Sequence, residues 1–205
     1  MRNLLFLTMS LLLVSIFVSA DEYQILDMNT PKIKIGDKIC SKKDTFSDKS
    51  TIYWTKTGQA IKAKNLETRE IVLFSERARN TKESKSIVDY FVKPNKMSVR
   101  GFNQLSDLAY SLPPTLYIFD SLRIESPIYM DSTRFYYLDY YHEGKRIVNP
   151  LPNECDTIII PRSIFTDSVN EEITANLFFK RIDIDKIFSV KDSIKLIILP
   201  ISIKE

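Results

Sequence analysis

The sequence reads RFYYLDYYHEGK over residues 134–145, and this stretch holds the clearest strand signal of the chain. Aromatic residues favour strands, because their side chains pack well on a pleated, half-buried surface. Residues 135–141 should therefore form a β-strand. Glu143-Gly144 and Lys145 follow, and a glycine after a polar residue is typical of a tight turn. We expect these three residues to be the tip of a β-hairpin.

A strand over residues 135–141 divides its aromatic side chains between two faces, because successive residues point to opposite sides. One face would hold Phe135, Tyr137, Asp139 and Tyr141, and the other Tyr136, Leu138 and Tyr140, with Arg134 and His142 at its ends. One face should pack in the core while the other exposes two or three rings. We take the face of Tyr136 and Tyr140, with Arg134 and His142, as the candidate partner-binding surface, since tyrosine offers a broad, stiff contact area with a polar tip. The alternative is that these tyrosines only fill the core and cover strand edges.

Other short strand candidates surround this hairpin. They are residues 116–119, 122–124, 157–160, 173–179 and 194–203. Residues 150–153 contain two prolines and should form a loop. About six or seven short strands over residues 115–205 predict an immunoglobulin-like β-sandwich, although the Cys–Trp–Cys spacing of true immunoglobulin domains is missing.

Residues 21–80 contain a second group of short strands. Ile33, Ile35 and Ile39 bracket a turn at Gly36-Asp37, and further candidates are residues 51–54, 60–63 and 70–74, with a turn at residues 65–68. Short strands at this spacing predict a small N-terminal β-sheet or barrel-like domain.

A short helical segment over residues 81–114 should connect the two β-rich parts. Residues 84–92 place Ile87, Val88, Phe91 and Val92 at helical spacing, and residues 103–112 place Leu105, Leu108, Ala109 and Leu112 on one side. Pro113-Pro114 should end the second helix. Whether the two β-rich parts form one domain stays open at this point.

Residues 1–20 have the three parts of a secretory signal peptide. Arg2 precedes an apolar run over residues 4–18, and Val18-Ser19-Ala20 offers small side chains for cleavage. The alternative, an uncleaved anchor, would need about 20 apolar residues to cross the hydrocarbon core. We therefore expect cleavage after Ala20 and an exported protein, periplasmic or secreted, whose mature chain has no membrane span.

Composition argues against several classes of chemistry. The formal net charge of +3 is no footprint for nucleic acid, which requires dense basic residues on one face. His142 is the only histidine, so a catalytic triad would depend on it, and a zinc site lacks ligands. The four glycines stand apart and form no phosphate-binding loop. We expect no cofactor and no metal.

Two further features leave alternatives open. Cys40 and Cys155 are the only cysteines, and an exported chain can bridge them, or they can stay two separate small apolar residues. A carboxylate-based hydrolase needs only two acids. The acids available in the C-terminal part are Asp139, Glu143, Glu171, Glu172, Asp183 and Asp185, and no pair is marked by its surroundings.

Several strings resemble small exported proteins of Bacteroidetes bacteria. They are KIGD at residues 34–37, STIYW at 50–54, QAIKA at 59–63 and LRIESPIY at 122–129. The resemblance spans most of the mature chain but describes no chemistry, and such proteins have no assigned activity. It implies a bacterial envelope or secreted location and a protein partner.

These observations predict an exported, non-catalytic protein-interaction or structural accessory module of the bacterial cell envelope. Its partner would be another envelope or secreted protein. The first alternative is a carbohydrate-binding domain that uses exposed tyrosines, with a glycan as its partner, and the second is the carboxylate-based hydrolase. The sequence does not define the oligomeric state.

Overall fold

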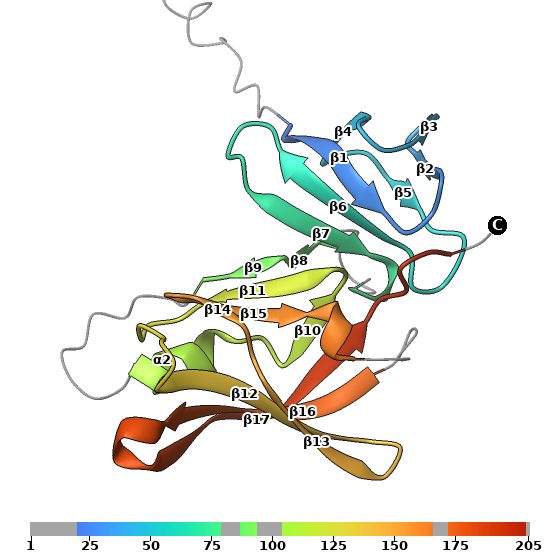
Figure 1. Ribbon diagram of the computed structural model, residues 1–205. Coiled ribbons are helices and arrows are strands. Elements are labelled where there is room, and N and C mark those ends of the chain that lie inside the picture. The colour runs from blue at the N-terminus through green and yellow to red at the C-terminus, as the bar shows by residue number, and fades with distance from the viewer. Residues whose placement is uncertain (1–19, 79–86, 94–103, 166–171, 204–205) are drawn as a thin grey trace, which may run out of the picture.

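The structure is a computed structural model that describes residues 20–78, 87–93, 104–165 and 172–203. The chain is mainly β, as predicted (Figure 1). The expected signal peptide lies outside the described residues except for Ala20. No helix in the described ranges is long and apolar enough to span a membrane.

The N-terminal half of the molecule, residues 22–89, is built from two antiparallel sheets. The five-stranded sheet runs β4 (Thr45–Ser47), β1 (Glu22–Met28), β6 (Ala60–Asn65), β7 (Ile71–Ser75) and β8 (Ile87–Asp89). The three-stranded sheet runs β3 (Lys38–Cys40), β2 (Ile33–Ile35) and β5 (Ile52–Tyr53). The turn predicted at Gly36-Asp37 joins β2 to β3, and Gly36 takes a φ of +58°, which a residue without Cβ adopts at little cost.

The two N-terminal sheets pack on a common core that includes Ile25, Ile33, Ile35 and Ile61. Three aromatic rings fill its centre. Tyr23, Phe46 and Phe74 lie with their centroids 5.3 to 5.7 Å apart, from strands β1, β4 and β7. Strands β1 and β4 were not predicted, although they supply two of these rings.

The C-terminal half, residues 91–203, is a second pair of sheets. One runs β10 (Thr115–Ile118), β17 (Lys186–Ile198), β16 (Glu172–Arg181), β12 (Arg134–His142) and β13 (Lys145–Pro150). The other runs β14 (Asn153–Glu154), β15 (Thr157–Pro161), β11 (Ser121–Glu125) and β9 (Phe91–Val92). Their facing sides form the largest core cluster, which includes Leu122, Ile124, Leu138, Ile158 and Leu196. The chain is thus confirmed as mainly β, whereas the immunoglobulin-like β-sandwich stays a prediction.

The remaining elements are short. Helix α2 (Gln104–Ser111) buries Leu108 against the C-terminal core, and it confirms the second predicted helix, of which residue 103 lies outside the described residues. Three 3-10 turns are η1 (Glu76–Ala78), η2 (Arg162–Ile164) and η3 (Ile182–Ile184). The proline-containing stretch is only partly a loop, because Pro150 ends β13 and Asn153 begins β14. A proline fits there because β13 is an edge strand.

The hairpin predicted at residues 143–145 joins β12 to β13. His142 pairs with Lys145, so Glu143 and Gly144 form a two-residue loop with φ values of 49° and 76°. Positive φ at both positions defines a type I′ turn, whose twist matches that of the flanking strands.

The helix predicted over residues 84–92 is wrong for its described part, residues 87–92. This segment is extended: β8 pairs with β7 of the N-terminal half, and β9 pairs in parallel with β11 of the C-terminal half. Ile87, Val88, Phe91 and Val92 are β-branched or aromatic and suit either period over so short a run. The bend at Tyr90 lets one stretch of chain serve as the edge strand of two sheets.

The two halves share a third cluster of buried side chains. Ala60 and Leu73 of the N-terminal half pack with Phe119, Ile197 and Leu199 of the C-terminal half. The chain after β17 then returns to the N-terminal half, where the Ile203 amide donates to the Asn29 carbonyl at 2.6 Å.

Asn29 itself is buried at this junction and has every polar side-chain atom bonded. Its Nδ2 donates to the carbonyls of Gly58 at 2.8 Å and Pro200 at 3.0 Å, and its Oδ1 accepts from the Ala60 amide at 2.9 Å. Buried polar groups are costly unless they are bonded in this way, and the bond to Pro200 joins Asn29 to the C-terminal half.

The bridge between Cys40 and Cys155 is not formed. Both cysteines are free, Cys40 buried in the N-terminal core and Cys155 exposed in the turn between β14 and β15. The sequence could not exclude the bridge, because it says nothing about the distance between two residues in different halves.

Candidate binding surfaces

Tyr136, proposed as an exposed ring, is completely buried, with 0% of its surface exposed. Its ring lies 4.8 Å from that of Phe179, and its hydroxyl is 3.1 Å from the Ser126 hydroxyl. Burial raises the pKa of Tyr136 to about 12. The prediction that this ring contacts a partner is therefore wrong, because its face of β12 packs on the four-stranded sheet.

Tyr140 is buried on the same face, with 3% exposed. Its hydroxyl donates to the Ile164 carbonyl at 3.2 Å and accepts from Asn149 Nδ2 at 3.2 Å. Its ring packs 5.6 Å from Phe165. Both tyrosines of the predicted surface thus have core roles.

Arg134 and His142 lie half-exposed at opposite ends of β12 and do not meet in one site. The Arg134 guanidinium donates two hydrogen bonds to Asp131 Oδ2, from Nε at 3.0 Å and from Nη2 at 2.5 Å. These bonds hold the pKa of the Asp131 carboxyl below its usual range. This pair lies across the chain reversal before β12, so Arg134 has a local structural partner. The structure brings together no two of the four predicted side chains as an exposed patch.

The opposite face of β12 is the exposed one, and we call it the outer face. Tyr141 has 68% of its surface exposed, and the Tyr137 ring stacks on Phe178 of β16 with centroids 5.2 Å apart and planes 16° apart. Val148 on the edge strand β13 is paired with Asp139 and is 48% exposed. The outer face therefore combines one exposed ring, Tyr141, and the half-buried pair of Tyr137 and Phe178 with an edge strand.

The outer face also carries an ion pair. Arg146 of β13 contacts both carboxylate oxygens of Asp139, with Nε at 2.9 Å and Nη2 at 2.6 Å. The hydrogen bonds from Arg146 lower the pKa of Asp139. The pair borders a hollow of about 640 Å³ that Tyr141, Thr174 and Asn176 also line. Such a hollow places a ring beside donors and acceptors.

The carboxylates considered for hydrolysis mostly have basic partners. Glu172 pairs with Lys195 at 2.7 Å and Asp183 with Arg181 at 2.5 Å, while Glu171 lies outside the described residues. A general acid needs a raised pKa. Hydrogen bonds from Arg181 and Arg146 instead lower the pKa values of Asp183 and Asp139. No three His, Cys, Asp or Glu side chains gather as metal ligands in the part of the chain that the structure describes.

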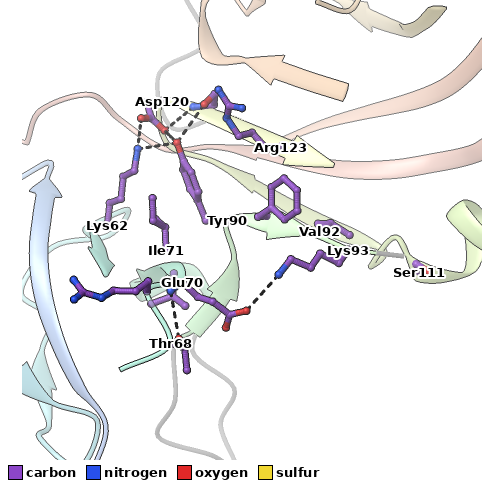
Figure 2. A pocket seen from close by; sticks show the side chains of 14 residues that line it. Lys62, Thr68, Glu70, Ile71, Tyr90, Val92, Lys93, Ser111, Asp120 and Arg123 are labelled. Carbon is purple, nitrogen blue, oxygen red and sulfur yellow. Dashed lines mark hydrogen bonds and ion pairs between the residues drawn. The ribbon is translucent and has the colours of Figure 1, made fainter. Parts of the chain in front are cut away.

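A second candidate surface was not predicted. It is a cleft of about 1000 Å³ between the two halves, lined on the N-terminal side by Arg69, Glu70 and Ile71 and on the C-terminal side by Phe91, Lys93 and Arg123 (Figure 2). Because these residues come from distant parts of the sequence, only the docking of the two halves creates the cleft.

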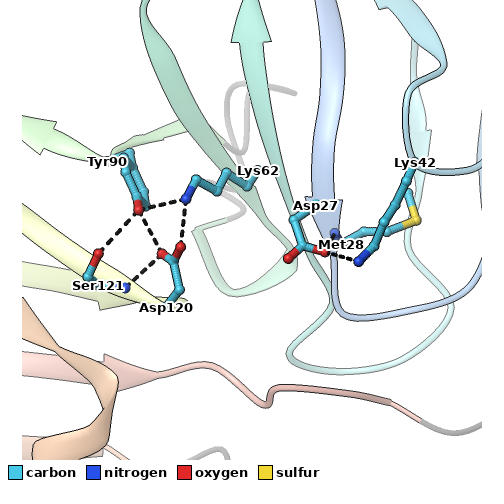
Figure 3. Close-up of polar contacts among 7 residues, drawn as sticks. All are labelled: Asp27, Met28, Lys42, Lys62, Tyr90, Asp120 and Ser121. Carbon is cyan, nitrogen blue, oxygen red and sulfur yellow. Dashed lines mark hydrogen bonds and ion pairs between the residues drawn. The ribbon is translucent and has the colours of Figure 1, made fainter.

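One end of the cleft is closed by a polar cluster that joins the halves (Figure 3). Lys62 Nζ lies 2.6 Å from Asp120 Oδ2 and donates to the Tyr90 hydroxyl at 2.7 Å, and that hydroxyl donates to Asp120 Oδ1 at 2.8 Å. The same ammonium lies 4.2 Å above the Tyr90 ring. Ser121 completes the cluster through its hydroxyl, 3.2 Å from that of Tyr90.

Burial and hydrogen bonding act in opposite directions on this cluster. Burial alone would lower the pKa of Lys62 and raise that of Asp120. The hydrogen bonds outweigh burial, because the pKa of Lys62 is raised and that of Asp120 is lowered. Both groups therefore stay charged near neutral pH, and the cluster acts as an ion pair between the halves.

The chain matches no protein-family model, no curated protein sequence and no solved structure. The fold defines a mainly-β protein of two halves, each built from two sheets on a shared core. A common edge segment and a third core cluster join the halves, which carry an exposed aromatic sheet face and a cleft with basic side chains between them.

Proposed function

We propose that this chain is an exported, non-catalytic protein-interaction or structural accessory module of the bacterial cell envelope. Its partner is another envelope or secreted protein, and export follows cleavage after Ala20. The resemblance to small exported proteins of Bacteroidetes bacteria supports the location.

The outer face is the surface that we assign to the partner. The observation behind this assignment is the exposure of Tyr141 and Val148 beside the stacked pair of Tyr137 and Phe178. Rings of this kind are enriched at protein interfaces, where they bury a large area at little cost in side-chain entropy. The Asp139–Arg146 pair adds a fixed polar group that can orient a partner on the face.

The outer face is tested by crosslinking in the native envelope. A photoreactive residue replaces Tyr141 in one variant and Tyr110, an exposed tyrosine of helix α2, in a matched control. We expect one specific crosslinked protein from position 141 that is absent from position 110. Val148→Ser should weaken that crosslink several-fold, and equal labelling from both positions would reject the outer face as the contact surface.

Carbohydrate binding is the second candidate function, and the hollow beside Tyr141 favours it. A ring next to the Asp139–Arg146 pair can stack on a sugar while the charged groups bond its hydroxyls. A glycan array probed with the mature chain and with Tyr141→Ala separates the two functions. Signal that disappears in the variant supports a glycan ligand, whereas a blank array with a positive crosslink supports the protein partner.

A further inference from the structure

The cleft between the two halves has the dimensions of a binding site. Its volume of about 1000 Å³ lies at the upper end of the range for small-ligand pockets. Figure 2 shows Lys62, Tyr90 and Asp120 at one end and Thr68, Glu70 and Lys93 at the other, with Ile71 between them. Clefts at the junction of two domains are preferred places for ligands.

Basic side chains outnumber acidic ones along the cleft. Lys62, Arg69, Lys93 and Arg123 face it, against Glu70 and Asp120. Both acids already have basic partners, since Glu70 lies 3.4 Å from Lys93 and Asp120 lies 2.6 Å from Lys62. Arg123 is paired as well, with Glu154 at 2.8 Å. Arg69 is therefore the basic side chain of the cleft that has no acidic partner among the described residues, and it favours an anionic ligand.

Arg69 is held in a backbone conformation that arginine rarely adopts. Its φ is 66°, in the left-handed region where glycine or asparagine is less costly. The turn is fixed by buried Asn65, whose Oδ1 accepts from the amides of Glu67 at 2.8 Å and Thr68 at 3.0 Å. Strained positions of this kind cluster at functional sites. The conformation belongs to the turn between β6 and β7, in which the Arg69 amide donates to the Asn65 carbonyl at 3.0 Å, so the turn fixes where the Arg69 side chain starts.

The Arg69 side chain is also available to a ligand. It is exposed, and no side chain within the described ranges forms an ion pair or hydrogen bond with it. Nearby, the Lys93–Glu70 pair is long and solvent-exposed, and such pairs exchange readily with a competing carboxylate.

The cleft has an apolar floor between these charges. Ile71 is 37% exposed, and Phe91 lies half-buried on β9 beside buried Val92. Lys93 Nζ lies 5.7 Å from the centre of the Phe91 ring. A ligand would therefore place an apolar side chain on Ile71 and Phe91 while an acidic group reaches Arg69 or Lys93.

We propose that this cleft binds an acidic peptide segment that alternates carboxylate and apolar side chains. The planar guanidinium of Arg69 offers the paired donors that match a carboxylate. A nucleic-acid backbone fits less well, since three of the four basic groups already have acidic partners. The site is separate from the outer face, so its test is independent of the crosslinking experiment.

The test is a titration of residues 21–205, followed by amide NMR, with the capped tripeptide acetyl-Glu-Phe-Glu-amide. We expect saturable shifts at Arg69, Ile71 and Arg123. The matched peptide acetyl-Gln-Phe-Gln-amide should bind about tenfold more weakly, because it lacks the charge-assisted hydrogen bonds.

Two variants separate binding from folding. Arg69→Gly should reduce the affinity for the acidic peptide about tenfold without lowering the melting temperature, because glycine accepts the left-handed conformation. Lys186→Gln, at the first residue of β17, removes one positive charge as Arg69→Gly does and should leave the affinity for the acidic peptide unchanged. Equal affinity for the two peptides, retention of binding in Arg69→Gly, or no saturable shift at millimolar peptide would each overturn the proposal.

Discussion

Tyr136 and Tyr141 lie on one strand but in opposite environments. Tyr136 is enclosed by the sandwich core, whereas Tyr141 stands 68% exposed on the outer face. Because side chains alternate along a strand, an odd spacing puts the two rings on opposite faces. The side chain is the same at both positions, so the role of each tyrosine depends on the face of β12 on which it lies.

Replacing the two tyrosines should have very different effects on stability. Tyr136→Ala should lower the free energy of unfolding by about 3–5 kcal/mol, because it leaves a cavity and removes one partner of the Ser126 hydroxyl. Tyr141→Ala should change it by less than about 0.5 kcal/mol. Urea denaturation of both variants measures the difference. Similar losses would mean that β12 presents its faces differently from the structure.

The alternation along β12 was predictable, but the choice of face was not made correctly. Both faces offer several rings, so hydrophobicity alone does not separate them. The available signal was Asp139, which shares its face with Tyr137 and Tyr141. A carboxylate is seldom buried without a partner, and Asp139, only 7% exposed, is paired with Arg146 of the edge strand β13. The need for such a partner favours the outer face over the apolar core.

The hairpin of β12 and β13 shows what local sequence can determine. The turn was predicted because a two-residue loop with glycine has few alternatives, and the structure confirms it.

Segment 87–92 shows the opposite case. Its apolar residues fit a helical period, yet each of its ends finds a strand partner in a different half. The secondary structure of such a segment depends on strand partners that are distant in sequence. A local sequence pattern gives no information about those partners.

The turn also gives a prediction for stability. Glu143 has a φ of 49°, and asparagine tolerates this left-handed conformation better than glutamate. Glu143→Asn should therefore raise the free energy of unfolding by about 0.5 kcal/mol. Glu143→Gln removes the same charge without the conformational advantage and serves as the control. An equal gain in both variants would assign the effect to charge, and the type I′ argument would fail.

At the scale of the whole molecule, the division into two β-rich parts was predicted, but their junction was not. Lys62, Tyr90 and Asp120 meet there from three distant places in the sequence, and each is an ordinary residue in its local context. The cleft beside them was missed for the same reason. Its lining depends on how the two halves dock, and the buried contacts of Ala60, Leu73 and Leu199 that fix this docking are not visible in the sequence.

The junction predicts a stability that depends on pH. The pKa of Asp120 is lowered in the folded protein: burial alone would raise it, but the hydrogen bonds from Lys62, Tyr90 and the Ser121 amide outweigh burial. The unfolded chain therefore takes up a proton on this carboxyl at a higher pH than the folded chain. The stabilisation from Asp120 is then complete above its unfolded pKa of about 3.9, and it is lost as the pH falls through the lower folded value.

Asp120→Asn should consequently lower the free energy of unfolding near neutral pH but have little effect in strong acid. The Asp120 side chain is 51% exposed, so solvent screening limits the expected loss at pH 7 to about 1 kcal/mol. Urea denaturation of the wild type and of Asp120→Asn, at neutral pH and near pH 2, measures the difference in their free energies of unfolding. The other carboxylates are the same in both proteins and do not contribute to this difference. Asp37→Asn makes the same charge change at an exposed turn and should have almost no effect. If Asp120→Asn lowered the free energy of unfolding equally at both pH values, the ion pair would not stabilise the junction of the halves. The apolar cluster of Ala60, Leu73 and Leu199 would then account for the docking by itself.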